Sequence, residues 1–228
     1  RVDGTPFAAE LGAPSPRRLD LSALPRSAID ALVAALARSA AGKGEVPAET
    51  LSLIWSRSEG SPFYAEQLFL YLFEAGLLDR RLRVTGEPFE LPPNITTMLV
   101  ARIDRLSASL RALIQTASVL GREFDAALLS RMLRGRELGP ELERGERESI
   151  WNLVTELRYL FKHALIRDSA YGMLLKARLR ELHRLAAEAI EQGYATGLAG
   201  PYEALGHHSA QAGEQSARRR WYGKARVH

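Results

Sequence analysis

The chain has 228 residues, of which 46% are hydrophobic and 25% charged, and its formal net charge is +4 at pH 7. This composition is typical of a globular protein with a packed core, and it excludes an intrinsically disordered chain. The absence of cysteine excludes disulfides and thiolate chemistry. No apolar run approaches the roughly 18 residues of a transmembrane helix, and no signal peptide is recognisable. We therefore expect a cytoplasmic protein that makes no use of a membrane. Because the first residue is Arg1 rather than Met, we expect it to be part of a longer protein.

The first third of the chain predicts a loop, a short strand and three helices. Residues 1–16 are rich in Gly, Pro and Ala, as in a loop, and residues 18–21 (RLDL) favour a strand. Apolar side chains then recur at helical spacing over residues 25–42, 47–58 and 62–75. The third of these helices is apolar around nearly its whole circumference, so we expect it to be buried on several sides.

A tight corner separates the second helix from the third. Gly60 follows the end of one helix, while Ser61 and Pro62 fit the cap and first position of the next. One interpretation is that these residues only stop one helix and start another. The other is that the N–H groups of the new helix, together with the Pro62 ring, face a bound nucleotide.

The middle of the chain predicts a small hairpin, three helices and a strand. Residues 82–84 (LRV) and 89–91 (FEL) fit the two strands of the hairpin. Helices are predicted over residues 94–106 and, as a pair, over 107–133, whereas the polar residues 135–148 predict a loop or mobile insertion. Three helices followed by a strand are typical of a winged helix. Such a fold could read DNA through its second or third helix, with Arg131, Arg134 and Arg136 on phosphates. Against this, the helix lacks an Asn, Gln or Arg cluster on one face for base edges.

His163 lies at the junction between a predicted strand, formed by Tyr159, Leu160 and Phe161, and the helix predicted to follow it. A histidine at such a joint is either a capping or core residue or a ligand contact. The segment from Arg158 to Arg184 contains seven basic and two acidic residues. Lys162 and Arg167 are among the basic ones. This basic stripe suits phosphates, and it equally suits a solvated helix face.

The C-terminal part predicts a long amphipathic helix to Gln192 and a helix pair over residues 202–213 and 216–228. The pair is similar to the first unit of a tetratricopeptide-like (TPR-like) array. His207 and His208 are adjacent, so we expect them to point to different sides of a helix, which argues against a paired metal site. We predict no metal site and no catalytic residue in the chain.

No phosphate-binding G-x-x-x-x-G-K-[ST] motif is present, and no acidic residues follow an apolar strand to hold Mg²⁺. A serine nucleophile elbow is also absent. We therefore expect that this chain does not hydrolyse ATP by itself.

Three stretches carry a resemblance to a known family. They are RSEGSPFYAEQLFLYLFEAGLL (57–78), LPPNITTMLVARIDRLSASLRALIQTASVLGREF (91–124), and FKHALIRDSAY (161–171) followed by ARLRELHRLAAEAIE (177–191). In this order they resemble the C-terminal side of bacterial STAND-type regulatory ATPases, the large AAA/NACHT-like ATPases found fused to adenylate or guanylate cyclase, kinase or LuxR-type modules. The resemblance departs at Ser61, where the family has Asn.

The resemblance implies a mainly α-helical fold in four parts. Residues 1–24 would end a nucleotide-binding core, 25–90 would form a helical lid with a hairpin, 91–168 a winged-helix domain with short β-hairpins, and 169–228 a linker helix and the first TPR-like repeat.

The resemblance also implies a regulatory function and its site. Gly60, Ser61, Pro62 and His163 would contact ATP or ADP, with His163 near the phosphate, and Lys162 and Arg167 are candidate contacts to phosphate or nucleic acid. Mg²⁺ would come with the missing nucleotide-binding core, and the isolated fragment would hold no cofactor. Exchange of ADP for ATP would release the winged helix and reorient the repeats.

The expected partners are the missing core, a fused effector module such as a cyclase, and a protein or inducer bound by the repeats. Two other functions stay open. One is a winged-helix regulator that binds DNA, and the other is a TPR-like scaffold for protein interactions.

Overall fold

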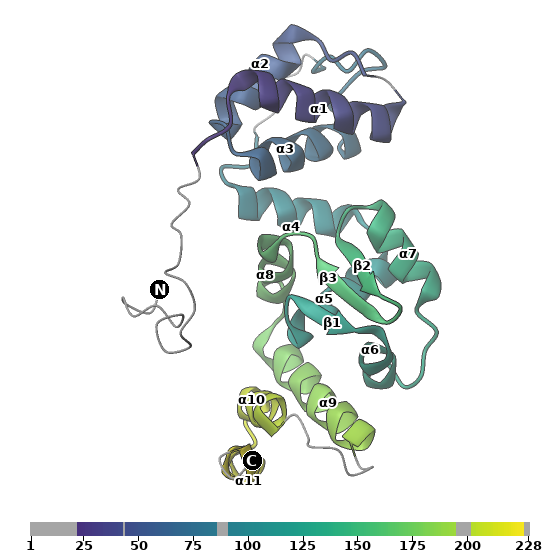
Figure 1. Cartoon of the computed structure of the whole chain (residues 1–228), viewed down its shortest axis with the longest axis vertical. Coiled ribbons are helices and arrows are strands. Elements are labelled where there is room, and N and C mark those ends of the chain that lie inside the picture. Colours follow the sequence, from purple (N-terminus) through teal and green to yellow (C-terminus); the bar gives the residue numbers. More distant parts are fainter. Residues whose placement is uncertain (1–21, 43, 86–90, 195–201, 226–228) are drawn as a thin grey trace, which may run out of the picture. The chain divides into compact units, whose positions relative to one another are not determined.

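The computed structural model describes residues 22–42, 44–85, 91–194 and 202–225 (Figure 1). Over these residues the protein is mainly helical, with one small antiparallel sheet. The chain divides into two compact units, residues 1–88 and 89–228. The strand predicted at residues 18–21 lies outside the described residues. Within the described ranges, no helix has both the length and the apolar composition needed to cross a membrane.

The first unit contains the three predicted helices, α1 (Arg26–Ala41), α2 (Ala48–Ser58) and α3 (Pro62–Glu74). Helix α1 buries Ile29, Val33 and Ala37, which are spaced four residues apart and so lie on one face. Helix α3 is buried without a break from Ala65 to Leu72, as its apolar circumference predicts. Both α1 and α2 pack against α3.

A short loop after α3 closes the first unit. Its only pairing among the described residues is an isolated antiparallel bridge between Leu78 and Val84. The buried Thr50 hydroxyl of α2 donates to the Leu82 carbonyl at 2.8 Å and fastens the loop to that helix. The predicted hairpin differs from this arrangement, because its first strand, 82–84, is bridged only through Val84, to Leu78. Most of its second strand, 89–91, lies outside the described residues.

The second unit begins with two helices, α4 (Ile95–Arg105) and α5 (Ala108–Leu120). Asn94 caps α4 as predicted, since its side-chain oxygen accepts the Thr97 N–H at 2.9 Å. The unit continues through β1 (Glu123–Asp125), α6 (Ala126–Met132), α7 (Gly139–Arg147), β2 (Trp151–Thr155) and β3 (Arg158–Phe161).

The three strands form an antiparallel sheet in the order β1-β3-β2, beside α5, α6 and α7 (Figure 1). Four aromatic side chains make its core, with ring centroids 5.4–6.5 Å apart: Phe124, Trp151, Tyr159 and Phe161. At the outer strand, the N–H of Leu153 donates to a carboxylate oxygen of Glu146 on α7 at 2.9 Å.

Helix α7 corrects the prediction of a loop over residues 135–148. It is strongly charged and buries only Leu142 and Gly145. Tertiary packing explains it: the buried Trp151 ring lies on Gly145 and donates its Nε1–H to the Leu142 carbonyl at 2.9 Å. This contact stabilises a helix that its own sequence specifies weakly.

The rest of the second unit is helical: α8 (Ala164–Gly172), α9 (Lys176–Tyr194), α10 (Tyr202–Ala212) and α11 (Gln215–Ala225). The last two form the predicted helix pair, and α10 packs on both α9 and α11. Ala187, Ile190, Leu205 and Trp221 form the core between these helices.

Replacing Gly145 with Ala should destabilise the second unit. The added Cβ would lie 2.3 Å from Trp151 ring atoms, so the indole must move, and we expect the free energy of unfolding to fall by about 1–3 kcal/mol. Gly139→Ala is the matched control, because it lies on the same helix with no atom within 4 Å of the added Cβ. Chemical denaturation should place the control within about 1 kcal/mol of the wild type. Equal stability of both variants would contradict the packing of Trp151 on Gly145.

Candidate functional site

The predicted nucleotide contacts fall in both units, with residues 60–62 in the first and His163 in the second. Gly60 has φ +78° and is buried, and its carbonyl accepts the N–H of Leu24 at 2.9 Å. An added Cβ would lie 2.6 Å from the Leu24 carbonyl oxygen and 2.8 Å from the Ala23 Cβ. Local packing therefore requires glycine here, whether or not a nucleotide lies nearby.

Ser61 and Pro62 are both exposed at the start of α3. The Ser61 hydroxyl accepts the N–H of Tyr64 at 3.4 Å, as an N-cap does, and Pro62 has no N–H to donate. The start of α3 thus has fewer N–H groups for a phosphate than a typical helix N-terminus has. The exposed Pro62 ring is the feature of this turn best suited to contact a nucleotide, and that contact stays a prediction.

His163 occupies the N-cap position of α8, directly after β3, and is half-buried. Its carbonyl accepts the N–H of Ile166 at 3.1 Å, but its imidazole makes no capping hydrogen bond. The capping interpretation of the side chain is therefore wrong. A contact from this imidazole to a nucleotide phosphate stays a prediction.

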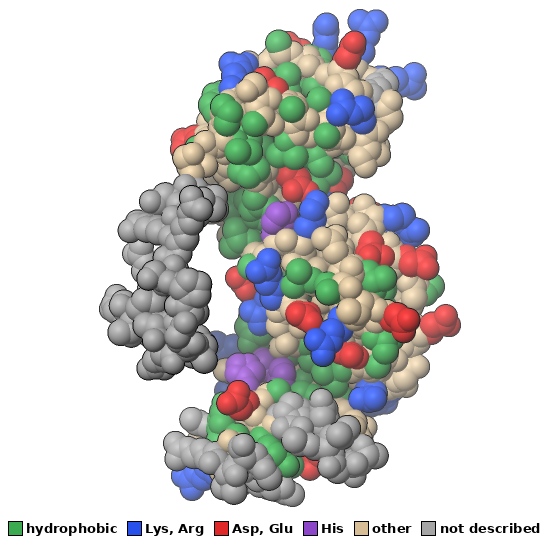
Figure 2. Space-filling view, in the orientation of Figure 1, with side chains coloured by type: hydrophobic (Ala, Val, Ile, Leu, Met, Phe, Trp, Pro, Cys, Tyr) green, Lys and Arg blue, Asp and Glu red, His purple; other side chains and the backbone are tan. Residues whose placement is uncertain are grey.

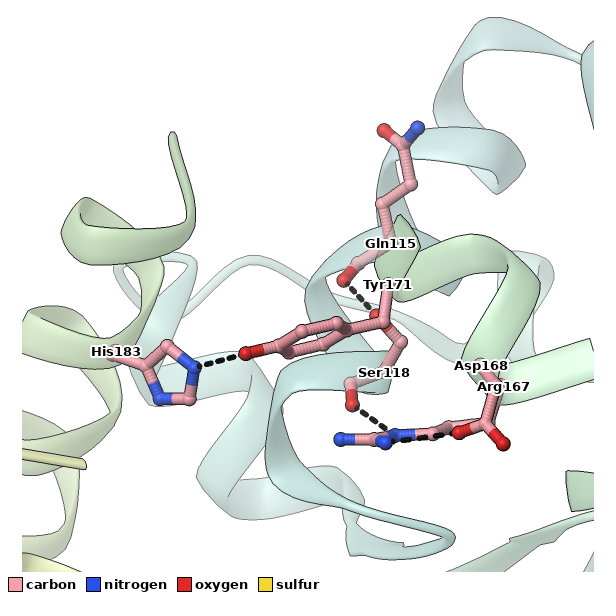
Figure 3. A network of polar contacts seen from close by, with 6 residues as sticks. All are labelled: Gln115, Ser118, Arg167, Asp168, Tyr171 and His183. Carbon is pink, nitrogen blue, oxygen red and sulfur yellow. Dashed lines mark hydrogen bonds and ion pairs between the residues drawn. The ribbon is translucent and has the colours of Figure 1, made fainter. Parts of the chain in front are cut away.

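Arg167, predicted as a candidate phosphate contact, is engaged inside the second unit (Figure 3). Its Nε donates to the Ser118 carbonyl of α5 at 2.7 Å, and it pairs with Asp168 at 3.0 Å. The guanidinium carbon also lies 4.7 Å from the centre of the Tyr171 ring, within cation–π distance. Arg167 thus joins α8 to α5. Lys162 directly follows β3, and its backbone N–H donates to the Ile150 carbonyl at 3.0 Å. Its backbone therefore extends the strand rather than the helix α8.

A chain of polar contacts continues from Tyr171 to the C-terminal helices. The Tyr171 hydroxyl lies 3.0 Å from Nε2 of His183 on α9 (Figure 3). Nδ1 of His183 lies 2.8 Å from Nδ1 of His208 on α10. With the Arg167 contacts, this network links α5, α8, α9 and α10, and we call it the polar relay.

Burial lowers the pKa of His183 to about 4 and that of His208 to about 3. The nearby His207 adds to both shifts, and Arg167 adds to that of His183. Both rings are therefore neutral at pH 7, each with one N–H donor and one acceptor nitrogen. One Nδ1 of the pair can donate to the other without placing a charge in the core.

Sequence reasoning did not single out Tyr171, His183 or His208 as a group. A signal existed for His183, because it lies at helical spacing with the buried Ala186, Ala187 and Ile190. A polar side chain on the apolar stripe of a helix indicates a buried hydrogen-bond partner. Its partner His208 is 25 residues away and not identifiable from spacing.

The basic stripe is largely an ion-paired surface. Four of its seven members have carboxylate partners, in the pairs Arg158–Glu123, Arg167–Asp168, Arg178–Glu181 and Arg184–Glu188. This pairing favours the interpretation of a solvated helix face over a dedicated phosphate-binding surface.

The first unit also has an open hollow of about 1000 Å³ beside α1. Charges of both signs line it, from Asp30, Glu45, Arg81 and Arg83. The predicted nucleotide contacts do not line this hollow.

Neither a protein-family model nor a curated protein matches the chain.

Replacing Gly60 with Ala should cost more stability than the same change at Gly76. Both glycines have positive φ, +78° and +68°, so alanine is strained at each by about 1–2 kcal/mol. Only at Gly60 does the new Cβ meet residues 23 and 24, and we expect a further loss of about 1–3 kcal/mol there. The free energy of unfolding of the two variants measures the difference. Equal losses would mean that the contact with residues 23 and 24 is absent in solution.

Replacing Arg167 with Lys should destabilise the second unit, because lysine lacks both the Nε–H that reaches Ser118 and the planar group that stacks on Tyr171. We expect the free energy of unfolding to fall by about 1.5–3 kcal/mol, as for a hydrogen bond to a charged group. Arg178→Lys is the control, since its pair with Glu181 is exposed and should change stability by less than about 0.5 kcal/mol. A loss at Arg167 no larger than the control's would contradict its role as the α5–α8 link.

Proposed function

We propose that the chain is the regulatory part of a STAND-type ATPase. In this proposal the 60–62 turn and His163 contact the nucleotide held by a separate core, and the helices after His163 pass its ADP or ATP state to the C-terminal helix pair. The chain supplies no hydrolytic group of its own.

The polar relay is the observation that carries this proposal. His163 begins α8, and Arg167 and Tyr171 on the same helix reach α5 and His183. A movement of α8 at its N-cap would therefore act on α9 through the partly buried Tyr171–His183 contact and on α10 through the buried His183–His208 contact. Switches of this kind require a rigid element with differential contacts in two states.

The order of elements in the second unit supports the winged-helix part of the proposal. Helix α5 is followed by β1, α6, α7, β2 and β3, and β3 pairs with both other strands. A winged helix has this order, with the β2–β3 hairpin as its wing. The helix pair α10–α11 fits one unit of a repeat array, because its two helices pack on each other and α10 packs on the preceding helix α9.

Charge and hydropathy argue against the DNA-binding alternative. A winged helix that reads DNA places its third helix in the major groove, but α7 carries three glutamates against two arginines. The hairpin exposes mainly apolar side chains, with Leu153, Val154 and Leu157 about half exposed, and its exposed Arg158 is paired with Glu123. Such a surface suits a protein partner such as the nucleotide-binding core.

The nucleotide role of His163 can be tested in the protein that contains this chain together with its core. We expect His163→Ala to release ADP faster by about tenfold or more, because a charge-assisted hydrogen bond to phosphate contributes roughly 1.5–3 kcal/mol. Release of a fluorescent ADP analogue measures this rate.

Lys176→Ala is the control, because it removes an exposed basic side chain from the same stripe without touching α8. Unchanged ADP release in His163→Ala would remove the nucleotide role from this residue. A salt-dependent affinity of the chain for duplex DNA would instead support the alternative.

A further inference from the structure

Three histidines converge in the C-terminal half of the second unit. His183 comes from α9, and His207 and His208 from α10, and one ring nitrogen of each lies within 4.8 Å of the other two. The rings are 5.0–5.8 Å apart between centroids. Figure 2 shows histidine side chains gathered at the surface in this part of the molecule. His207 is exposed and His208 is buried, as expected of adjacent residues on a helix, but both rings contact His183, so adjacency does not keep their nitrogens apart.

We propose that His183, His207 and His208 form a binding site for a divalent transition-metal ion, with Zn²⁺ as the ion of choice and a fourth position open to water. Neutral imidazole nitrogen is a preferred ligand of zinc, and a three-histidine set with one open position is an established zinc geometry. The cluster has no carboxylate, so it does not suit Ca²⁺ or Mg²⁺, which require oxygen ligands.

The distance between His183 and His208 requires only a small adjustment, whereas the nitrogens of the whole trio, which lie within 4.8 Å of one another, must draw closer. Two nitrogen ligands of a tetrahedral zinc ion, each about 2.05 Å from the metal, lie about 3.3 Å apart. Nδ1 of His183 and Nδ1 of His208 are 2.8 Å apart, joined by a hydrogen bond. Metal binding replaces that hydrogen bond: the ring that donates its Nδ1–H changes to the tautomer with the proton on Nε2, and the two rings separate by about half an ångström.

Tyr171 supplies the support that a metal-binding histidine needs. Its hydroxyl oxygen lies 3.0 Å from Nε2 of His183, on the far side of the ring from the cluster. When Nε2–H donates to this oxygen, the proton stays on Nε2 and the lone pair of Nδ1 faces the metal. The guanidinium of Arg167 lies over the Tyr171 ring and helps to hold the tyrosine side chain in place.

Burial prepares two of the ligands and leaves the third accessible. His183 and His208 are 1% and 5% exposed, and their lowered pKa values keep them unprotonated at pH 7. A neutral ring of this kind coordinates a metal once its proton is on the nitrogen that faces away from the ion. His207 is exposed, which gives the ion a path of entry and keeps the fourth position in contact with solvent.

A hydrogen-bonded histidine pair explains His183 and His208 but gives no role to the exposed His207. With a metal bound, the three side chains would tie α9 to α10, helices joined through a connection that includes residues 195–201. This inference does not depend on the proposed nucleotide function, because it requires only that the three histidine rings and Tyr171 lie as they do, and no nucleotide enters the argument.

The test is a calorimetric titration of the full chain with ZnCl₂ at pH 7, after removal of metals with a chelator. We expect one ion per chain and a rise in melting temperature on binding. Titration with Co²⁺ should give the visible absorption of a tetrahedral nitrogen-ligated ion. Absence of binding, or binding with no rise in melting temperature, would overturn the proposal.

His207→Ala is the first variant, because this exposed residue can be removed without opening the core. We expect its affinity for Zn²⁺ to fall at least tenfold. His163→Ala is the matched control, which also removes one histidine but leaves the cluster intact, and its affinity should equal that of the wild type. Equal affinities in the two variants would place the metal elsewhere and overturn the proposal.

Tyr171→Phe tests the supporting contact while keeping the aromatic ring. We expect its affinity to fall about 10–100-fold, as is usual when a partner of a metal-binding histidine is lost. An unchanged affinity would overturn the assignment of Nδ1 of His183 as the ligand atom.

Discussion

The second unit depends on one guanidinium group. Arg167 donates to the last turn of α5, lies over the ring of Tyr171 on its own helix, and through that ring supports the contact to α9. A guanidinium can satisfy a carbonyl, a carboxylate and an aromatic face at once because it is planar and has five N–H donors. These contacts help to position α8, which also buries Ile166 and Ala170 and packs on α4, α5 and β3. Both proposals, the coupling through α8 and the metal site beyond Tyr171, depend on that position.

Most helices of this fold are predictable from the sequence because their ends carry chemical signals. Asn94 caps α4, and Ser61 with Pro62 begins α3 as expected. Helix α7 was missed because its residues are mostly charged and its burial comes from Trp151, which lies outside the helix. The Leu78–Val84 bridge was missed because a single pair leaves no alternating pattern in the sequence.

The candidate sites were less predictable than the fold. A single residue such as His163 can be singled out from its place between two patterns, but its partners cannot. The contacts of Arg167 with Ser118 and of His183 with His208 span 49 and 25 residues and depend on how helices pack. The convergence of His183, His207 and His208 was not predictable for a related reason. Helical spacing sets the directions of two neighbours, but it does not show that a third side chain from another helix contacts both.

The contact between Glu146 and Leu153 has a consequence for association between chains. Strand β2 is an outer strand of its sheet, and it exposes Leu153 and Val154. An outer strand with apolar side chains is a template on which a foreign strand can add, and proteins commonly block it with a charge. Because the Glu146 carboxylate occupies the Leu153 N–H, an incoming strand must displace a charged acceptor before it can pair there. Helix α7 therefore protects the sheet against edge-to-edge aggregation, although its sequence marks it only as a polar segment.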